Sequence, residues 1–561
     1  MKNLKSKRKF SNFKGEIIDG DGKRHMGMLT LRPHPKLIGA SKERVKQVYE
    51  AEIEKIPLSK ILRDIIMVGK QCGQDVDADG FAIEPNGEVA VSLPAMAHIA
   101  SVALRLASEK GFKIDKGDEY VKPHKIKNTL DESFKYILPL CLIYNSFPAM
   151  KFDKTIFDNT AYRKLQLISP IVFAIERYTI TLRHLMARCA AWYRGIPSKY
   201  NIRIPTDVDE YILNQYGING EELIVGNLSL YAAGMNNHVI VKEIFRDIRN
   251  PEDHPARKLL RYSKTIADYK HDTIVKMSLA GDSIHNATAS LIKYPIVNIA
   301  DELWSIPIPR LLLNTLVETI HWNLYDHFLE VSGNTTNSYT KWFGKVFETY
   351  VVELMKSSFT RKMQSEYIYN EKDKSPDLME IHTDKALLVE VKARRPSLIV
   401  RRFDSPDAVA KVEEFIKETL GQVVNFIDKH CNDGDAGKPH FRGIRDYIVI
   451  VVTPEWWPVN PLIEIGFADS IIKKCLDDNS HINSIRPYFV PVTDLEIIPR
   501  LKGHQFAYNL FDAYLKSNLF PNSSFSDYIK LKSGINDQLI NPYVADQFDS
   551  GFKICEGYFN G

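Results

Sequence analysis

Cysteine is scarce in this chain, with six residues in 561 and no two of them spaced as a C-x-x-C pair. Zinc sites built from cysteine use such pairs, and disulfide-stapled folds use many more cysteines, so the scarcity argues against both. A reducing, cytoplasmic compartment is the setting that this cysteine usage favours.

Long apolar runs are also lacking. The longest, residues 136–144 and 447–453, are far shorter than the roughly 20 residues that a membrane-spanning helix needs. The basic residues near the start are followed by no apolar stretch, which predicts that no secretory signal is present. We therefore expect no membrane partner.

A charge excess of one sign is missing from the chain as a whole. Its 74 Lys and Arg against 70 Asp and Glu give a net charge of +4. Residues 1–25 alone hold eight basic and three acidic residues, or +5, which leaves −1 for the remainder. Global charge therefore gives no support for a protein that coats nucleic acid, and any such binding must come from a local site. With 44% apolar and 26% charged residues, the composition argues against a disordered or fibrous chain.

Changes of pattern along the chain predict several domains. Residues 1–90 are expected to form a basic arm and a small helical or irregular region, and 91–335 an α-helical domain for sensing, binding or assembly. The polar run 332–338 predicts a domain boundary. Residues 336–494 follow as an α/β domain, and 495–561 as an aromatic-rich appendage packed on it.

Two possible metal motifs occur in the first 335 residues. Residues 75–80 match the opening of an EF-hand calcium loop, but Asn86 replaces the bidentate glutamate and Pro85 blocks the second helix, which favours a plain acidic turn. His271-Asp272 resembles the pair of an HD phosphohydrolase, yet it lacks partners at helical spacing. We favour ordinary surface or core histidines here and keep a phosphohydrolase as a third option.

The pattern after residue 338 is typical of a mixed sheet covered by helices. Apolar periodicity predicts the order α-β-β-β-α-β. The expected elements are a helix at 339–357, strands at 365–370, 377–382 and 386–393, a helix at 407–430 and a buried strand at 446–452.

Two carboxylates and one amine are expected to meet at one end of this sheet. Side chains alternate along a strand, so Glu390 and Lys392 share a face. With a suitable hairpin register, Asp377 lies on that face, opposite residue 390 or 392. Two carboxylates and the backbone carbonyl of Val391 could bind Mg²⁺, with Mn²⁺ as a substitute. Such a metal activates a phosphodiester, and Lys392 would orient water or stabilise charge.

These residues resemble the core of the PD-(D/E)XK nuclease superfamily: Pro376-Asp377, a thirteen-residue step to Glu390, then E-V-K at the end of an apolar strand. The G-x-x-F-E segment that ends at Glu348 resembles a further part of that core, and Gln422 is placed as in RecB-type members. The resemblance covers about residues 339–455. It implies a restriction-endonuclease-like αβββαβ fold with Asp377 and Glu390 as metal ligands, Lys392 as catalytic lysine, and Glu348 and Gln422 as supporting residues.

The expected activity is that of a Mg²⁺-dependent endonuclease in a multidomain, mainly helical chain. DNA is expected rather than RNA because the family mostly cuts DNA, and the family suggests restriction, antiviral defence or DNA repair. The helical region would then bind a protein partner or a second copy of the chain. The alternative is a catalytically inactive nuclease fold used for nucleic-acid binding or assembly.

Basic and aromatic residues follow the strand that carries Lys392. Residues 341–402 hold thirteen basic and nine acidic residues, and its arginines are candidates for phosphate contacts, with a solvated basic loop as the equal alternative. Trp456-Trp457 could stack on unpaired bases, but packing over the sheet is the favoured interpretation. The candidate arginines are Arg394, Arg395, Arg401 and Arg402.

Overall fold

The structure is a computed structural model. It describes residues 16–18, 24–26, 42–71, 81–83, 90–110, 137, 140–141, 181–236, 240–241, 253–261, 263–265, 291, 294–300, 303–314, 320–333, 337–359, 363–368, 374–403, 406–430, 441, 443–499, 506–517, 524–533 and 540–560. The acidic turn at 75–80 and His271-Asp272 lie outside these residues.

Contacts divide the chain into two compact units. The first comprises residues 1–151, 177–179 and 227–315, and the second comprises 152–176, 180–226 and 316–561. Each unit is therefore assembled from separate stretches of sequence. The boundaries expected at residues 90, 335 and 494 stay predictions.

The first unit is built mainly from helices. Helices α1 (Lys42–Glu54) and α2 (Leu58–Gln71) are separated at Pro57 and pack on α3 (Leu93–Lys110). The apolar spacing from Ser41 to about Lys70 predicts a helix with a break near Pro57, and the structure confirms that break. A small four-stranded sheet in the same unit, which the sequence did not predict, has the order β5-β8-β7-β6. Its strands are β5 (Ile240–Val241), β6 (Lys264–Thr265), β7 (Val297–Ala300) and β8 (Leu303–Ser305).

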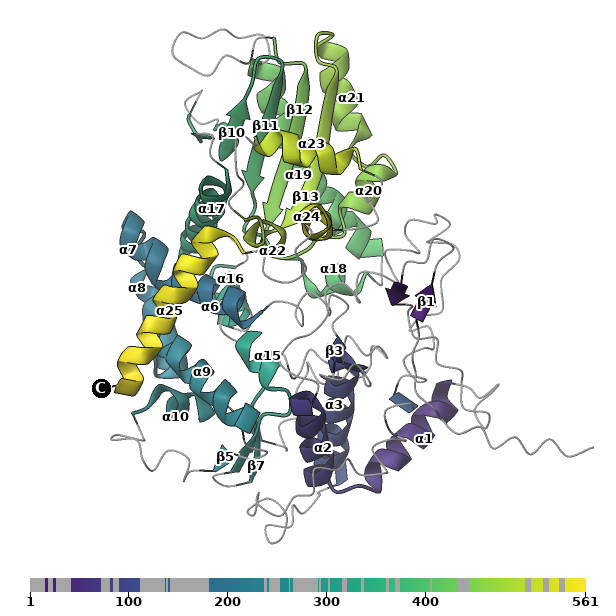
Figure 1. Ribbon diagram of the computed structural model, residues 1–561, viewed down its shortest axis with the longest axis vertical. Coiled ribbons are helices and arrows are strands. Elements are labelled where there is room, and N and C mark those ends of the chain that lie inside the picture. The colour runs from purple at the N-terminus through teal and green to yellow at the C-terminus, as the bar shows by residue number, and fades with distance from the viewer. Residues whose placement is uncertain are drawn as a thin grey trace, which may run out of the picture. The chain divides into compact units, whose positions relative to one another are not determined.

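A helical layer in the second unit supports its sheet (Figure 1). The aromatic ring of Trp192 packs edge-on against Phe343, Phe347 and Tyr350 of α17, while α25 packs on α6 and α17. The helices of this layer are α6 (Leu182–Ala190), the π-helical segment η3 (Ala191–Gly195), α7 (Ile196–Tyr200), α8 (Thr206–Tyr216), α16 (Ile320–Val331), α17 (Ser338–Ser358) and α25 (Pro542–Asn560).

From the sequence, Ser169-Pro170 predicts the start of a long helix that ends near Tyr193, before Gly195, and the predicted end is wrong. The helix continues without a break through η3 into α7 and ends at Asn201, which adopts a left-handed conformation with φ of 55°. A Cβ at residue 195 would overlap the side-chain oxygen of Gln547 in α25. Gly195 thus lies where α25 approaches closely, and the helix does not stop at it.

One buried ion pair joins three helices of this layer. Arg188 of α6 donates to both carboxylate oxygens of Glu496, at 2.6 and 2.8 Å, and Tyr350 of α17 donates to the same carboxylate at 2.7 Å. Glu496 belongs to the short helix α22 (Val492–Glu496) that follows the last strand of the sheet. Both charged side chains are almost fully buried, with 3% and 0% exposed.

The second unit contains a mixed five-stranded sheet in the order β13-β12-β11-β10-β9. β9, β10 and β11 are antiparallel, whereas β11, β12 and β13 are parallel. A mainly helical chain with a mixed sheet in its C-terminal half is thus confirmed. The strands are β9 (Gln364–Ser365), β10 (Leu378–Ile381), β11 (Lys385–Val391), β12 (Asp446–Thr453) and β13 (Ser484–Pro491).

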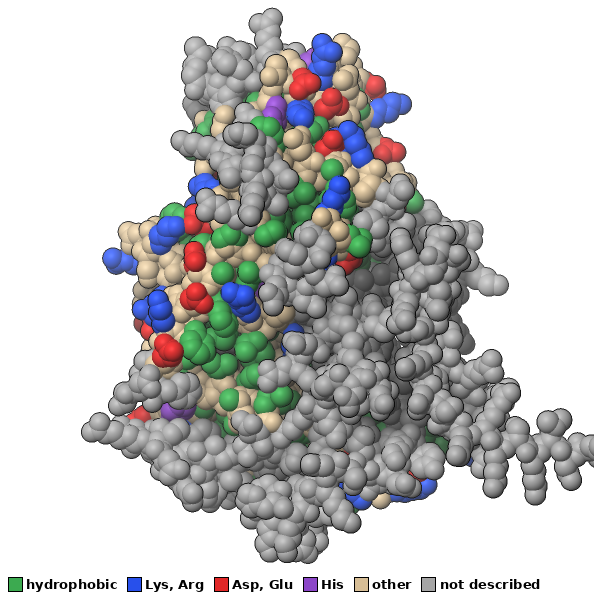
Figure 2. Space-filling view, viewed as in Figure 1, with side chains coloured by type: hydrophobic (Ala, Val, Ile, Leu, Met, Phe, Trp, Pro, Cys, Tyr) green, Lys and Arg blue, Asp and Glu red, His purple; other side chains and the backbone are tan. Residues whose placement is uncertain are grey.

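Helices cover both faces of this sheet. α19 (Pro406–His430) and α21 (Asp469–Asp478) pack on one face, where Met379 and Leu388 belong to the shared core. α23 (Ala507–Leu515) packs on the other face, against β11 and β12. Acidic and basic side chains are interspersed over the α23 side, with no field of one sign (Figure 2). None of the helices among the described residues is long and apolar enough to cross a membrane.

The expected appendage is helical wherever it is described. Besides α23, it contains α24 (Phe525–Ser533), and the rings of Phe511 and Phe525 stack with centroids 4.6 Å apart. Within the appendage, α23 is the helix that packs on β11 and β12 of the sheet.

Candidate active site

The hairpin register brings Asp377 and Glu390 to the same end of the sheet. The last pair of the β10–β11 ladder is Leu378 with Val389, so the next residues along the two strands, Asp377 and Glu390, face each other. Glu390 and Lys392 alternate with Val391 and lie on the face that α19 covers, as Leu388 does. The predicted juxtaposition of two carboxylates and one amine is thus present.

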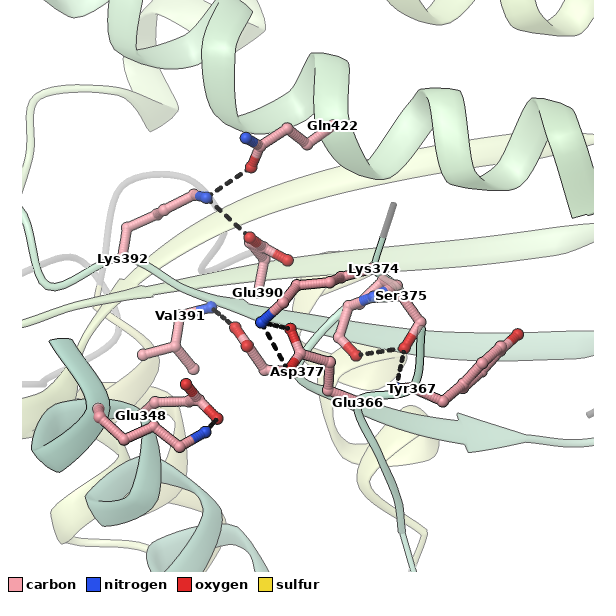
Figure 3. Close-up of polar contacts among 12 residues, drawn as sticks. Glu348, Glu366, Tyr367, Lys374, Ser375, Asp377, Glu390, Val391, Lys392 and Gln422 are labelled. Atoms are coloured by element: carbon pink, nitrogen blue, oxygen red, sulfur yellow. Dashed lines mark hydrogen bonds and ion pairs between the residues drawn. The ribbon is translucent and has the colours of Figure 1, made fainter. Parts of the chain in front are cut away.

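Lys392 connects the strand to α19 (Figure 3). Its ammonium lies 2.8 Å from Oε1 of Glu390 and donates a hydrogen bond of 2.6 Å to Oε1 of Gln422. Only 22% of the lysine side chain is exposed. Glu390 and Lys392, predicted together, therefore form one contact chain with Gln422 of a helix some thirty residues later.

Asp377 is a carboxyl group held in an acidic and largely buried place. Burial raises its pKa to about 8, and the nearby charges of Glu390, Glu348 and Glu366 act in the same direction. The backbone N–H of Val391 donates a 2.6 Å hydrogen bond to Oδ2 of Asp377 and opposes this shift. A nearby cation therefore stabilises the charged form of this carboxylate more than it would that of an ordinary, exposed aspartate.

Glu390 and Glu348 complete the acidic cluster. Burial raises the pKa of Glu390, and the adjacent Lys392 ammonium opposes that rise. Glu348 extends from α17 and pairs with Lys345 one turn earlier, at 2.6 Å. Its charge acts on both Asp377 and Glu390, so the helix residue singled out in the sequence does belong to this cluster.

Two residues of the cluster were missed in the sequence. Glu366 follows β9, and its backbone N–H donates to the carbonyl of Asp377 at 3.0 Å. Lys374 lies 3.1 Å from each carboxylate oxygen of Glu366. The register of β9 against β10 places Glu366 next to Asp377. The sequence does not define this register, because it depends on the conformation of the segment that joins the two strands.

The donor atoms fit a small, hard cation. Lys392 N–H donates to Val452 of β12 at 2.9 Å, whereas Val391 N–H donates the other way, to Asp377. Because the N–H and C=O of one strand residue point to the same edge, the Val391 carbonyl faces Asp377 beyond the end of the ladder. Mg²⁺ commonly takes one or two carboxylates and keeps several waters. That matches two carboxylates plus a carbonyl, and no set of three or more His, Cys, Asp or Glu ligands occurs among the described residues.

The four candidate arginines differ in what they contact. Arg394 is exposed, pairs loosely with Glu418 at 3.1 Å, and lies over the ring of Phe415. Its position remains open to an approaching phosphate. The side chain of Arg402 lies outside the described residues.

The expectation that Arg395 contacts phosphate is wrong for this conformation. Its side chain is 2% exposed and pairs with Glu455, at 3.2 Å, in the loop after β12. Arg401 approaches the same carboxylate at 2.5 Å and is 11% exposed. A carboxylate buried in this loop needs positive partners, so both guanidinium groups are directed inward.

Trp457 packs over the sheet, as the favoured interpretation predicted. It is 3% exposed, stacks on Phe415 of α19 with centroids 4.0 Å apart, and donates to the carbonyl of Arg394 at 3.2 Å. Trp456 packs against the same core. Base stacking is therefore not available to the buried Trp457 ring.

No family model, no curated protein and no solved structure gives a significant match. The site is therefore interpreted from its own geometry and chemistry.

The same substitution should cost far more stability at Arg395 than at the neighbouring Arg394. Arg395→Met leaves the Glu455 carboxylate buried with one cation fewer and should lower the free energy of unfolding by about 2–4 kcal/mol. Arg394→Met removes an exposed charge and should change it by less than about 0.5 kcal/mol. Urea denaturation of both variants measures this difference. Equal effects would contradict the burial described here.

Proposed function

We propose that this protein is a Mg²⁺-dependent nuclease of the PD-(D/E)XK type that hydrolyses phosphodiester bonds of DNA. The observation that carries the proposal is the contact chain from Glu390 through Lys392 to Gln422, with Asp377 opposite Glu390. Sequence motifs of this kind occur by chance, and a hairpin alone would place Asp377 near Glu390; the contact of Lys392 with Gln422, 30 residues later, needs the tertiary fold.

The order of elements supports the same proposal. α17 is followed by the antiparallel strands β9, β10 and β11, by the crossover helix α19, and by β12 parallel to β11. That is the αβββαβ order that the resemblance implies. The strand carrying Glu390 and Lys392 lies at the centre of the sheet, which gives the site a rigid support.

The bound cation would polarise the scissile phosphate and lower the pKa of a nearby water. Asp377, Glu390 and the Val391 carbonyl would hold it. The Glu390 and Gln422 contacts hold the Lys392 ammonium in place, so it can hydrogen-bond an attacking water or offset charge on the phosphate. Because this ammonium is already directed at the carboxylate of Glu390 and the amide oxygen of Gln422, we favour the charge-stabilising role over that of a general base.

An approaching polyanion would meet open surface beside the acidic cluster. Gly344 lies one helical turn before Glu348 in α17, and a Cβ there would meet no atom within 4 Å. Lys345, three residues before Glu348, and Arg394, two residues after Lys392, are exposed, with 53% and 44% of their side chains accessible. These residues could contact phosphates next to the one that is cut.

A nuclease fold that binds nucleic acid without cutting it is the second candidate. Both candidates predict nucleic-acid binding, and only the first predicts strand cleavage that chelation of the metal abolishes.

Lys392→Met should lower the rate of DNA cleavage by about 10²–10⁴-fold, because it removes a charge positioned at the reacting phosphate. The measurement is cleavage of supercoiled plasmid, linear duplex and single-stranded DNA and RNA with Mg²⁺, Mn²⁺ or EDTA. Lys417→Met on α19 is the matched control, since that lysine is 62% exposed and pairs only loosely with Glu413 at 3.9 Å. Wild-type protein that cuts no substrate, or a Lys392→Met variant that cuts as well, would contradict the proposal.

We further propose DNA rather than RNA as substrate, and restriction, antiviral defence or DNA repair as the setting. These follow from the resemblance alone. A protein partner or a second copy of the chain would bind through the helical region.

A further inference from the structure

Each glutamate of the acidic cluster is paired with a lysine. Lys392 bonds Glu390, Lys345 bonds Glu348 and Lys374 bonds Glu366, at 2.8, 2.6 and 3.1 Å. Asp377 instead accepts the backbone N–H of Val391. In this state, lysine ammonium groups supply the positive charge that the carboxylates require.

Lys374 differs from the other two lysines in how it reaches the cluster. Lys345 pairs with a neighbour on its own helix, and Lys392 is held from two sides. Lys374 comes from the segment just before Asp377, and its ammonium meets both oxygens of Glu366 while the charge of Glu348 also acts on it. It therefore interacts with two glutamates of the cluster, one just after β9 and one in α17.

The backbone beside Lys374 is fixed, whereas its side chain is accessible. Ser375 N–H donates to the carbonyl of Tyr367 at 2.9 Å, and Tyr367 N–H donates to the Ser375 hydroxyl at 2.9 Å. The lysine side chain is 59% exposed and its partner Glu366 is 22% exposed. The ammonium can therefore swing away from Glu366 without any change of the strands.

We propose that in the metal-free protein the Lys374 ammonium supplies positive charge that the divalent cation supplies when it is bound. When the cation binds, Lys374 leaves Glu366 and binds a phosphate oxygen of the nucleic-acid backbone. The proposal rests on the nuclease function proposed above. Glu366 lies next to Asp377, so repulsion between a cation held at Asp377 and the Lys374 ammonium weakens the bond from Lys374 to Glu366. A phosphate then offers the released ammonium a new partner.

This arrangement links metal binding to substrate binding. A cation that displaces Lys374 makes a phosphate ligand available, so the metal raises affinity for the polyanion, and by reciprocity the polyanion raises affinity for the metal. Lys374 would be a positioning residue for the backbone next to the cleaved bond.

Lys374→Met tests both halves of the proposal. Without nucleic acid, its Mn²⁺ affinity, measured by calorimetry, should rise by about threefold or more because a competing positive charge is gone. Duplex affinity should fall when it is measured in Mg²⁺ by fluorescence anisotropy, in a Lys392→Met background that does not cut. The slope of log affinity against log salt should become shallower by about 0.9, the loss of one phosphate contact.

Lys516→Met is the matched control, since Lys516 is 68% exposed and pairs with Asp512 at 2.9 Å away from the cluster. It should leave metal affinity and salt slope unchanged, and Lys374→Arg should keep the wild-type salt slope. Unchanged or lower Mn²⁺ affinity, or an unchanged slope, in Lys374→Met overturns the proposal while leaving the nuclease function intact. Wild-type protein that binds no Mn²⁺ overturns both.

Discussion

Asp377→Asn is expected to abolish metal-dependent cleavage and at the same time to stabilise the metal-free protein at alkaline pH. The amide keeps an oxygen that can accept the hydrogen bond from Val391 but loses the charge that a cation requires. We expect cleavage to fall below detection, a loss of at least about 10³-fold. Loss of function combined with a gain of stability is the mark of a group placed for binding rather than for folding.

The sign of the stability effect follows from the raised pKa of Asp377, which lies at about 8 against an ordinary value of 3.8. The folded metal-free protein keeps this proton between about pH 4 and 8, while the unfolded chain has released it. The free energy of unfolding therefore falls as pH rises through that window. Asp377→Asn removes this dependence and should raise the free energy of unfolding at pH 9 by about 1–3 kcal/mol, after allowance for solvent at this partly buried group.

Urea denaturation with EDTA at pH 5 and pH 9 measures the effect. Asp384→Asn is the matched control, because Asp384 is an exposed aspartate in the turn between β10 and β11. That variant should leave both cleavage and the pH dependence unchanged. An Asp377→Asn variant that is equally destabilised at both pH values would count against the raised pKa, and one that still cuts would count against the metal site.

Arg188→Met should give the largest loss of stability, about 3–5 kcal/mol, because it leaves the fully buried carboxylate of Glu496 without a counter-charge. Tyr350 can still donate one hydrogen bond to that carboxylate, which does not replace a bidentate guanidinium. The measurement is the midpoint of urea denaturation at pH 7, followed by circular dichroism.

The neighbouring Arg194→Met is the control for this substitution. Arg194 pairs with Glu221 at 3.2 Å, with 47% and 44% of the two side chains exposed, so its loss should cost less than about 0.5 kcal/mol. The double variant Arg188→Met with Glu496→Gln should recover part of the lost stability, since no charge is then left buried. A double variant no more stable than Arg188→Met alone would show that packing, not charge, sets the cost.

Local signals explain what the sequence could predict. Asp377, Glu390 and Lys392 belong to one hairpin, so strand alternation and a short turn were enough to place them together. α17 and α19 were predicted to within one residue of their observed ends, because their apolar periodicity is long and regular.

The features that the sequence could not predict depend on contacts between residues far apart in the chain. β13 was not predicted since its two prolines, Pro487 and Pro491, argue against a strand; they are tolerated because β13 lies at the edge of the sheet. Arg395 was expected at the surface because nothing in the sequence announces that Glu455 is buried some sixty residues later. The position of Glu366 beside Asp377 depends on the register between β9 and β10, which only the folded strands define.

Packing of α25 on α6 has a consequence for how the chain is made. α6 ends at Ala190 and α25 begins at Pro542, so 352 positions separate the two partners. At about 5–20 residues per second, the ribosome needs on the order of tens of seconds to make that stretch. Throughout this time the surface of α6 that α25 will cover has no native partner. The nascent chain should therefore engage chaperones during this interval, and the whole sheet that carries the candidate site emerges before its supporting helical layer is complete.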